Sequence, residues 1–274
     1  MPRQPGLAVT SSTRDDATAR VLVQGVSKTY NSSRGDVAAL GRVDCELNEG
    51  EFLSLLGPSG CGKTTLLMII SGLIPPSEGT VQINGEVVTR PYTGLGIVFQ
   101  QDVLLDWRTV LRNVMLQCEI RGLKESVYRE SAMSLLALVG LEEFADRYPW
   151  ELSGGMRQRV AICRALVHEP SLLLMDEPFG ALDALTREQM NFDLLRLRAD
   201  RRVSILFITH SIFEAVLLSD RILVMSPRPG EFVDEIHTNF GLHRTPAITE
   251  SREFASHMHR IREKFKAHGV LTDD

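Results

Sequence analysis

Four short stretches of the chain are apolar almost without interruption, which is the pattern of a strand buried on both faces of a sheet. They are EFLSLLG (51–57), SLLLMD (171–176), VSILFIT (203–209) and RILVMS (221–226). Other stretches have apolar residues at helical spacing, namely residues 63–73, 110–123, 125–141 and 156–167. Buried strands that alternate with helices predict an α/β fold built on a parallel sheet.

Two further β segments are expected near the N-terminus. VLVQGVSKTY (21–30) has the pattern of a strand, and VQINGEVV (81–88) predicts two short strands around Asn84-Gly85. This dipeptide favours the two-residue turns of β-hairpins. The region from about 102 to 152 has helical patterns and no strand pattern, so we expect a helical insert in the α/β core.

The pattern divides the chain into three parts. We expect residues 1–20 to be a disordered leader, residues 21–240 to be the folded domain, and residues 241–274 to be a polar, weakly helical tail. Pro227, Pro229 and Gly230 predict a turn by which the chain leaves the core.

Composition narrows the class of protein. A chain of 274 residues that is 43% hydrophobic and 24% charged is an ordinary globular protein of one or two domains. The net charge of −5 argues against nucleic acid as the main partner. Its four cysteines are far apart, which favours free thiols in a reducing cytoplasm over a metal site or a disulfide framework. No apolar run approaches the roughly 18 residues of a membrane span, so any membrane association would require another protein.

The sequence GPSGCGKT (57–64) lies between a predicted strand and a predicted helix. This context is the one in which such a glycine-rich loop wraps its backbone N–H groups around phosphates. Lys63 would reach the β- and γ-phosphates, and the Thr64 hydroxyl would ligate Mg²⁺. The alternative is a glycine-rich strand–helix turn without a ligand.

Two carboxylates end the buried strand at residues 171–176. Asp176 would hold the Mg²⁺, and Glu177 would lie beside the γ-phosphate, where a base can polarise water. On their own, the two residues could equally be ordinary charges at a strand end.

A second anion site is predicted in LSGGMRQR (152–159), where a serine and two glycines precede a helix. The free N–H groups and the positive end of the helix dipole favour an anion at such a place.

These motifs, in this order over roughly residues 21–235, resemble the nucleotide-binding subunit of an ABC transporter. LSGGMRQR is similar to the signature motif of that family. Gln100 matches its glutamine loop, Pro178 to Asp183 its loop after the catalytic glutamate, His210 its switch histidine, and Tyr30 its adenine-stacking aromatic. Taken singly, Tyr30 and His210 could be core residues and Gln100 a polar strand end.

The resemblance implies an α/β fold of the P-loop NTPase type, an ABC cassette with a parallel-sheet core, an antiparallel β subdomain and an α-helical subdomain. It implies ATP and Mg²⁺ as ligands and a head-to-tail homodimer in which the signature of one copy holds the γ-phosphate bound by the other. The catalytic residues implied are Glu177, His210 and Gln100. The metal ligands implied are Thr64, Gln100 and Asp176. The nucleotide-binding residues implied are Tyr30, Gly57, Pro58, Ser59, Gly60, Cys61, Gly62, Lys63, Thr64, Thr65, Ser153, Gly154, Gly155 and Asp183.

Several segments are similar to the cassettes of nitrate, taurine and aliphatic-sulfonate importers: FQQDVLLDWRTVLRNV, MDEPFGALDALTRE and VMSPRPG. The resemblance implies a peripheral position on the cytoplasmic face of the inner membrane, two transmembrane permease subunits and an extracytoplasmic solute-binding protein. Residues 102–115 would dock on the permease, with Trp107 either exposed there or packed inside the insert. Ser211 departs from the acidic residue usual after the switch histidine. The solute is not encoded in this chain.

Two other classes stay open on the sequence. An ABC ATPase of DNA repair or translation moves no solute, but such chains tend to carry a long coiled-coil or zinc-binding insert, or two cassettes. A regulatory module would hold ATP without hydrolysing it, and the presence of Glu177 and His210 argues against that reading.

Overall fold

The computed structural model describes residues 19–270, apart from residues 32, 34, 181 and 202. Its centre is a sheet in the order β10-β9-β3-β8-β7-β6. These strands are β3 (Phe52–Leu56), β6 (Leu95–Val98), β7 (Leu172–Asp176), β8 (Ser204–Thr209), β9 (Arg221–Met225) and β10 (Phe232–His237). All neighbours are parallel except β9 and β10. The four strands expected from uninterrupted apolar runs are confirmed.

A second, antiparallel sheet has the order β2-β1-β4-β5. It consists of β1 (Ala19–Tyr30), β2 (Val37–Asn48), β4 (Glu78–Ile83) and β5 (Glu86–Val87). The predicted hairpin is confirmed, since Asn84 and Gly85 have φ values of 52° and 81°. Left-handed backbone at both turn positions matches the twist of the flanking strands.

Alternate side chains of the central strands enter two different cores. Leu53 and Leu55 of β3 pack with the antiparallel sheet and with α1 (Lys63–Ile70), which lies between the two sheets. Phe52 and Leu56 of the same strand face the opposite core. The helices on that side are α5 (Gly154–Leu166), α6 (Ala184–Arg201), α7 (Ile212–Leu218) and α8 (Arg252–Ala267). This burial on both faces explains why most positions of β3, β7, β8 and β9 are apolar.

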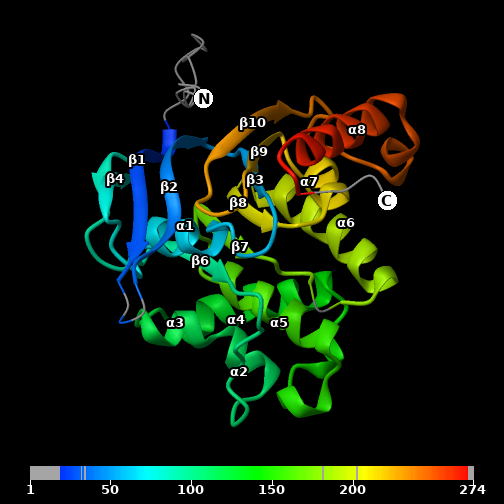
Figure 1. The fold of residues 1–274 in the computed structure, drawn as a ribbon. Helices are drawn as coiled ribbons and strands as arrows, with labels where there is room; N and C mark the ends of the chain where they lie inside the picture. The colour runs from blue at the N-terminus through cyan, green and yellow to red at the C-terminus, as the bar shows by residue number, and fades with distance from the viewer. Residues whose placement is uncertain (1–18, 32, 34, 181, 202, 271–274) are drawn as a thin grey trace, which may run out of the picture.

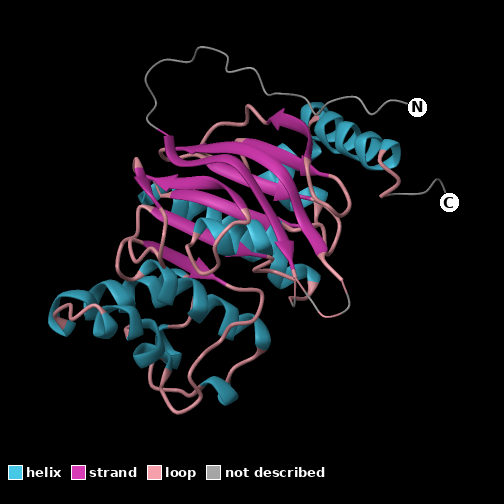
Figure 2. Ribbon diagram, turned by 60° about the vertical axis from the view of Figure 1, so that its left-hand side comes forward, coloured by secondary structure: helices cyan, strands magenta, loops and turns pink. Residues whose placement is uncertain are grey.

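A helical subdomain projects from the sheets and forms a separate mass in Figure 2. It contains α2 (Val110–Val114), α3 (Leu116–Ile120), α4 (Glu125–Leu138) and two short 3₁₀ helices, η1 (Glu142–Phe144) and η2 (Pro149–Glu151). No described residue between 102 and 152 is in a strand, as the pattern predicted. The helix expected over 110–123 is divided at Met115, which ends α2 and begins α3.

The C-terminal part of the chain is more ordered than the sequence indicated. After Pro229 the chain does not leave the core but returns to the sheet as β10. Residues 246–250 form a 3₁₀ helix, η3 (Pro246–Glu250), and α8 then packs on α7 through Phe254, Ile261 and Phe265. Residues 1–18 of the expected leader lie outside the described residues, whereas Ala19 and Arg20 belong to β1. Among the described helices, none combines the length and the apolar character of a membrane span.

Candidate nucleotide-binding site

The glycine-rich loop connects β3 to α1 and is folded around the Lys63 side chain. Lys63 Nζ donates hydrogen bonds to the carbonyl oxygens of Gly57 (2.8 Å) and Pro58 (2.9 Å), and the residue is only 4% exposed. Gly62 has φ 107°, and a Cβ there would lie 2.6 Å from the Ala39 carbonyl oxygen, so the position requires glycine. A Cβ on Gly60 would meet no atom within 4 Å. The outer side of the loop is therefore open to a ligand.

The carboxylate of Asp176 lies at the end of β7, beside this loop. Burial raises its pKa, while a hydrogen bond with Thr64 acts in the opposite direction. A buried carboxylate and a hydroxyl are oxygen ligands of the kind Mg²⁺ prefers. The described residues contain no group of three or more His, Cys, Asp or Glu side chains that could hold a metal by themselves. The site thus fits Mg²⁺ held by one carboxylate and a hydroxyl together with phosphate oxygens.

Glu177 is held between Lys63 and His210. Its Oε1 lies 3.9 Å from Lys63 Nζ, and its Oε2 lies 3.1 Å from His210 Nδ1. Its backbone has φ 43°, which is strained for a non-glycine residue, and its N–H donates to the Ile208 carbonyl of the neighbouring strand. Because the Glu177 side chain is 16% exposed and that of His210 is 54% exposed, the pair lies at the edge of open solvent.

Two other predicted residues lie on segments that border the site. The Tyr30 ring is 40% exposed at the end of β1, and its hydroxyl is 3.5 Å from Thr65 Oγ1 in the first turn of α1. A Cβ placed on Gly180, in the loop after Glu177, would lie 3.9 Å from Gln100 Nε2. The structure therefore brings Tyr30 to the glycine-rich loop and Gln100 to the loop that follows the carboxylates.

The second predicted anion site lies in a different part of the molecule. Ser153 is the N-cap of α5, and its hydroxyl accepts a hydrogen bond from the Met156 N–H at 3.3 Å. A Cβ on Gly154 would meet only the Arg157 side chain, at 3.9 Å, so the helix start is open. Neither Ser153 nor Gly154 is hydrogen-bonded to the glycine-rich loop in the described part of the chain. Within one copy, the structure does not bring the two anion sites together.

The loop after Glu177 packs against the start of that second site. Asp183 caps α6 by accepting the Thr186 N–H at 3.1 Å, and hydrogen bonds from the Thr186 hydroxyl and from this N–H lower the pKa of the Asp183 carboxyl. A Cβ on Gly155 would lie 3.0 Å from Thr186 Cγ2. Gly155 thus allows close contact between α5 and α6.

Three side chains near the site were not singled out from the sequence. Arg228 Nε donates to the Gly60 carbonyl of the glycine-rich loop at 3.3 Å. Arg187 and Glu214 connect the loop after Glu177 with the segment around His210. Arg187 and Arg228 lie in two segments that carry the family resemblance, MDEPFGALDALTRE and VMSPRPG. Their partners could not be read from these segments, because only the fold brings the contacting residues together.

Trp107, which the sequence left between exposed and packed, is 74% exposed. Its loop is held by the buried amide of Asn113, whose Nδ2 donates to the carbonyls of Leu105 and Arg108 at 3.0 Å each. The exposed indole is therefore displayed on a fixed segment.

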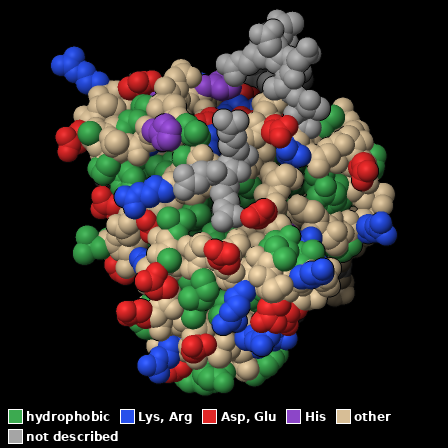
Figure 3. All heavy atoms as spheres, turned by 180° about the vertical axis from the view of Figure 1, so that it is seen from behind, with side chains coloured by type: hydrophobic (Ala, Val, Ile, Leu, Met, Phe, Trp, Pro, Cys, Tyr) green, Lys and Arg blue, Asp and Glu red, His purple; other side chains and the backbone are tan. Residues whose placement is uncertain are grey.

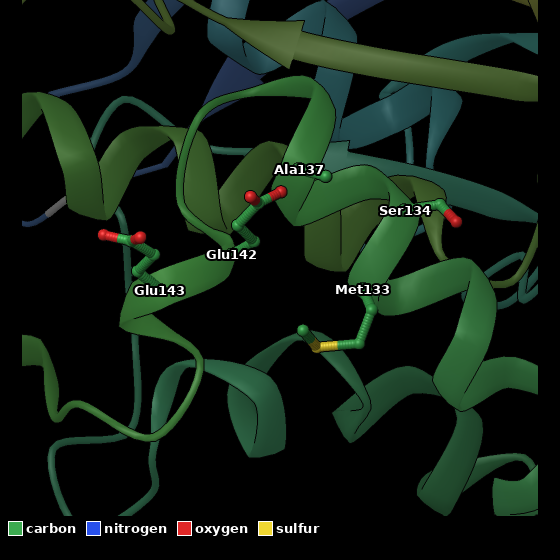
Figure 4. Close-up of a pocket in the computed structure, with 5 residues that line it drawn as sticks. All are labelled: Met133, Ser134, Ala137, Glu142 and Glu143. Carbon is green, nitrogen blue, oxygen red and sulfur yellow. The ribbon is translucent and has the colours of Figure 1, made fainter.

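A hollow in the described part of the surface lies apart from the predicted site residues. A hollow of about 460 Å³ lies on the helical subdomain, and none of its lining residues is a predicted site residue (Figure 4). They are Met133, Ser134, Ala137, Glu142 and Glu143. Positive and negative side chains alternate over the face in Figure 3.

Comparisons with known proteins agree with this geometry. A family model described as ABC transporter matches residues 40–180. An uncharacterized ABC transporter ATP-binding protein of Methanocaldococcus jannaschii is 43% identical, over 90% of this chain and 92% of that protein. The taurine import ATP-binding protein TauB of Rhizobium johnstonii is 50% identical over 74% of this chain and 78% of its own. The bicarbonate transport ATP-binding protein CmpD of Synechocystis sp. is 43% identical over 81% and 79%.

A solved structure has the same fold. It is the dimeric, post-hydrolysis state of an ATP-binding cassette bound to ADP and Pi, with a TM-score of 0.71 and 34% identity, covering 81% of this chain and all of that one.

Proposed function

The chain belongs to the ABC transporter family, and we propose that it is the subunit that couples ATP hydrolysis to the import of a small solute. As a cassette of this family, it binds and hydrolyses ATP. The observation that carries the proposal is the convergence of Lys63, Glu177 and His210 at the open side of the glycine-rich loop.

In the proposed reaction, the loop binds the phosphates of ATP and Lys63 moves from its carbonyl partners to the phosphate oxygens. Thr64 and Asp176, with Gln100, would hold Mg²⁺, which neutralises phosphate charge when it is bound. Tyr30 would stack on the adenine. These roles are supported by the hydrogen bond between Thr64 and Asp176 and by the 3.5 Å distance between the Tyr30 and Thr65 hydroxyl oxygens.

Glu177 is the proposed general base. It orients a water molecule toward the γ-phosphorus and takes its proton as the new P–O bond forms and the bond to ADP breaks. His210 holds the second carboxylate oxygen through Nδ1, which fixes the direction of the first. Glu177 has a positive φ of 43°. Such strained backbone clusters at active sites, where it fixes the direction of a side chain.

The second anion site explains why the active unit is proposed to be a pair of chains. Ser153, Gly154 and Gly155 make no hydrogen bond to their own glycine-rich loop among the described contacts, yet they form an open helix start suited to phosphate. In a head-to-tail dimer they would bind the γ-phosphate held by the other copy, with Asp183 nearby. The solved relative is likewise described as dimeric.

The transport role is supported by the relatives. The names of two of them specify taurine import and bicarbonate transport, and both solutes are small zwitterions or anions. We therefore propose two permease subunits as partners at the cytoplasmic face of the membrane, an extracytoplasmic solute-binding protein beyond them, and Mg²⁺ as the cofactor. Nitrate, sulfonates and related solutes are all compatible with the site, because a cassette does not touch the solute.

The variant Glu177→Gln tests the assignment. It keeps the size of the side chain but removes its basicity, so ATP turnover should fall by at least the roughly 10²–10⁴-fold typical of a lost general base. Binding of ATP should persist because Lys63 and Asp176 are unchanged. Since ATP bridges two copies, the variant with ATP should elute as a dimer on size exclusion, and the wild type with ADP as a monomer.

Glu143→Gln, an exposed carboxylate change on the helical subdomain, is the matched control and should leave turnover unaltered. Wild-type turnover by Glu177→Gln would exclude Glu177 as the base and make His210 the leading candidate for orienting the water.

A further inference from the structure

Glu214, on α7, has a buried carboxylate that the proposed reaction does not use. Its side chain is only 7% exposed, and its Oε2 accepts a hydrogen bond from Thr209 Oγ1 at 2.5 Å. Burial raises the pKa of Glu214, whereas the Thr209 hydroxyl, Arg187 and His210 act to lower it. A carboxylate in such a place is costly unless it is bound on both oxygens.

Arg187, on α6, is the cation that faces the other oxygen. Its Nε lies 3.9 Å from Glu214 Oε1, and its Nη2 donates to the Leu182 carbonyl at 2.9 Å. The Nε is buried and has no hydrogen-bond partner. The guanidinium thus joins the loop after Glu177 to α7. Its hydrogen bond to Leu182 is short, whereas its 3.9 Å contact with Glu214 could become shorter.

Glu214 also controls the backbone on both sides of His210. Thr209 Oγ1, which donates to Glu214, accepts the Ser211 N–H at 3.0 Å. The Glu214 N–H in turn donates to Ser211 Oγ at 3.3 Å. The residues before and after His210 therefore belong to one closed ring of hydrogen bonds, and His210 Nδ1 contacts Glu177 from that ring.

We propose that Arg187 and Glu214 are positioning residues that transmit the position of the loop after Glu177 to His210. When a second copy covers this loop, a shift of Leu182 moves Arg187 and changes its distance from Glu214. The change at Glu214 then alters the orientation of His210 relative to Glu177. Leu185, two residues before Arg187, is 80% exposed and offers an apolar contact to that copy. Hydrolysis is thereby made to depend on pairing.

The proposal rests on the proposed function, because it requires ATP hydrolysis by paired chains. It differs from a purely structural ion pair in what it predicts. A structural pair between α6 and α7 would stabilise the fold without affecting the catalytic rate of folded protein. A positioning pair changes kcat, since a misplacement of about 1 Å can cost on the order of 100-fold in rate, while the affinity for ATP is unaffected.

The test compares kcat and KM for ATP in Arg187→Gln, Glu214→Gln and the double variant, all in the full chain. We expect kcat to fall about 10-fold in each single variant, with KM changed by less than about twofold. The double variant should be no slower than the slower single variant, because the effects of substitutions within one network do not add. Arg187→Lys should recover part of the rate. Arg196→Gln, on the same helix but with a 68% exposed side chain, is the matched control.

Two further measurements keep the outcome unambiguous. In the Glu177→Gln background, Arg187→Gln should still form the ATP-dependent dimer. This result would show that the two copies still pair, so that the loss of rate comes from the lost coupling between the loop after Glu177 and His210. The ¹H–¹³C signal of the His210 ring should shift in Arg187→Gln without nucleotide and should not shift in Arg196→Gln.

Wild-type kcat in Arg187→Gln, or rate losses that multiply in the double variant, would overturn the transmission while leaving the ATPase assignment in place. A wild-type chain that hydrolyses no ATP would overturn the proposed function, and the positioning role with it.

Discussion

Individual residues at this site act through a small number of directed contacts. Lys63 is an example, because its ammonium is almost fully buried and is held by two carbonyl oxygens of its own loop. Phosphate oxygens carry more negative charge than carbonyl oxygens and form the stronger, charge-assisted bonds. We therefore expect ATP bound in this loop to offer Lys63 better partners than the carbonyl oxygens.

Replacing Lys63 tests this exchange of partners. Lys63→Ala should weaken ATP binding by at least about tenfold, since one charge-assisted hydrogen bond contributes roughly 1.5–3 kcal/mol. Isothermal titration calorimetry on the purified chain measures the change. Lys124→Ala, an exposed lysine before α4, is the control and should bind ATP normally. Equal affinities in the two variants would contradict the phosphate-binding role of the loop.

At Ser211 the structure explains a departure that the sequence left open. An acidic residue usually follows the switch histidine in this family, and here a serine does. Ser211 is the N-cap of α7, and its hydroxyl accepts the Glu214 N–H. Serine and aspartate are about equally good N-caps, so Ser211 can start the helix and hold the backbone beside His210 equally well.

The residues that could be predicted from sequence are those whose type and spacing encode a backbone shape or a ligand. Gly62 and Lys63 are of this kind. Arg187 and Glu214 are not, because an arginine and a glutamate 27 positions apart have no fixed relation until α6 and α7 pack together. The same holds for Arg228, whose contact with Gly60 spans 168 positions.

Elements begin and end in this chain by local rules that can be separated from function. Ser153, Ser211 and Ser251 each cap a helix by accepting a backbone N–H three residues ahead. The caps are chemically equal, yet only Ser153 is proposed to face a nucleotide. This allows a substitution that keeps the cap and changes only the charge presented to the ligand.

Ser153→Asp is that substitution. Aspartate caps a helix as well as serine does, so the free energy of unfolding should change by only a few tenths of a kcal/mol. Its charge should repel the γ-phosphate held by the other copy. ATP binding by the single chain should stay near normal, while ATP-dependent dimer formation and turnover should be lost.

Ser251→Asp, at the N-cap of α8, makes the same change in the same cap position and should leave turnover unaltered. Loss of ATP binding by monomeric Ser153→Asp would show that the signature acts on the nucleotide of its own chain, contrary to the proposed pairing.

The pattern of the chain predicted buried elements better than marginal ones. β3, β7, β8 and β9 have both faces covered, so most of their positions are apolar and their sequence pattern is easily distinguished. α8 was expected only as a weak helix, because most of its side chains are polar. Three residues, Phe254, Ile261 and Phe265, anchor it to α7. Such a thin apolar stripe depends on a partner surface that only the tertiary structure supplies.

The whole molecule combines a nucleotide-binding body of two sheets with a helical subdomain that projects from it (Figures 1 and 2). Gln100 lies at the start of the connection between them, close to the loop after Glu177. Arg157 of α5 is paired with Asp102 two residues further on, at 2.9 Å. The predicted nucleotide-site residue Gln100 therefore lies next to the segment that leads to Trp107, so a movement of Gln100 could displace that segment.

Trp107 is the proposed contact with the permease. A large aromatic side chain that is 74% exposed on a fixed loop is typical of an interface anchor. Trp107→Ala should weaken flotation of the chain with permease-containing membranes at least tenfold, which corresponds to about 1.4 kcal/mol. ATP turnover by the isolated chain should be unchanged, because Trp107 is outside the nucleotide site.

Ile120→Ala removes another exposed apolar side chain, 71% exposed on α3, and should leave flotation intact. Bare liposomes should capture neither variant nor the wild type, since binding is proposed to require a protein partner. Capture of the wild type by bare liposomes would instead indicate direct lipid binding. Equal flotation of Trp107→Ala and Ile120→Ala with permease membranes would move the docking surface away from residues 102–115. The exposed Tyr148–Trp150 stack, with ring centroids 4.5 Å apart, would then be the next aromatic surface to change.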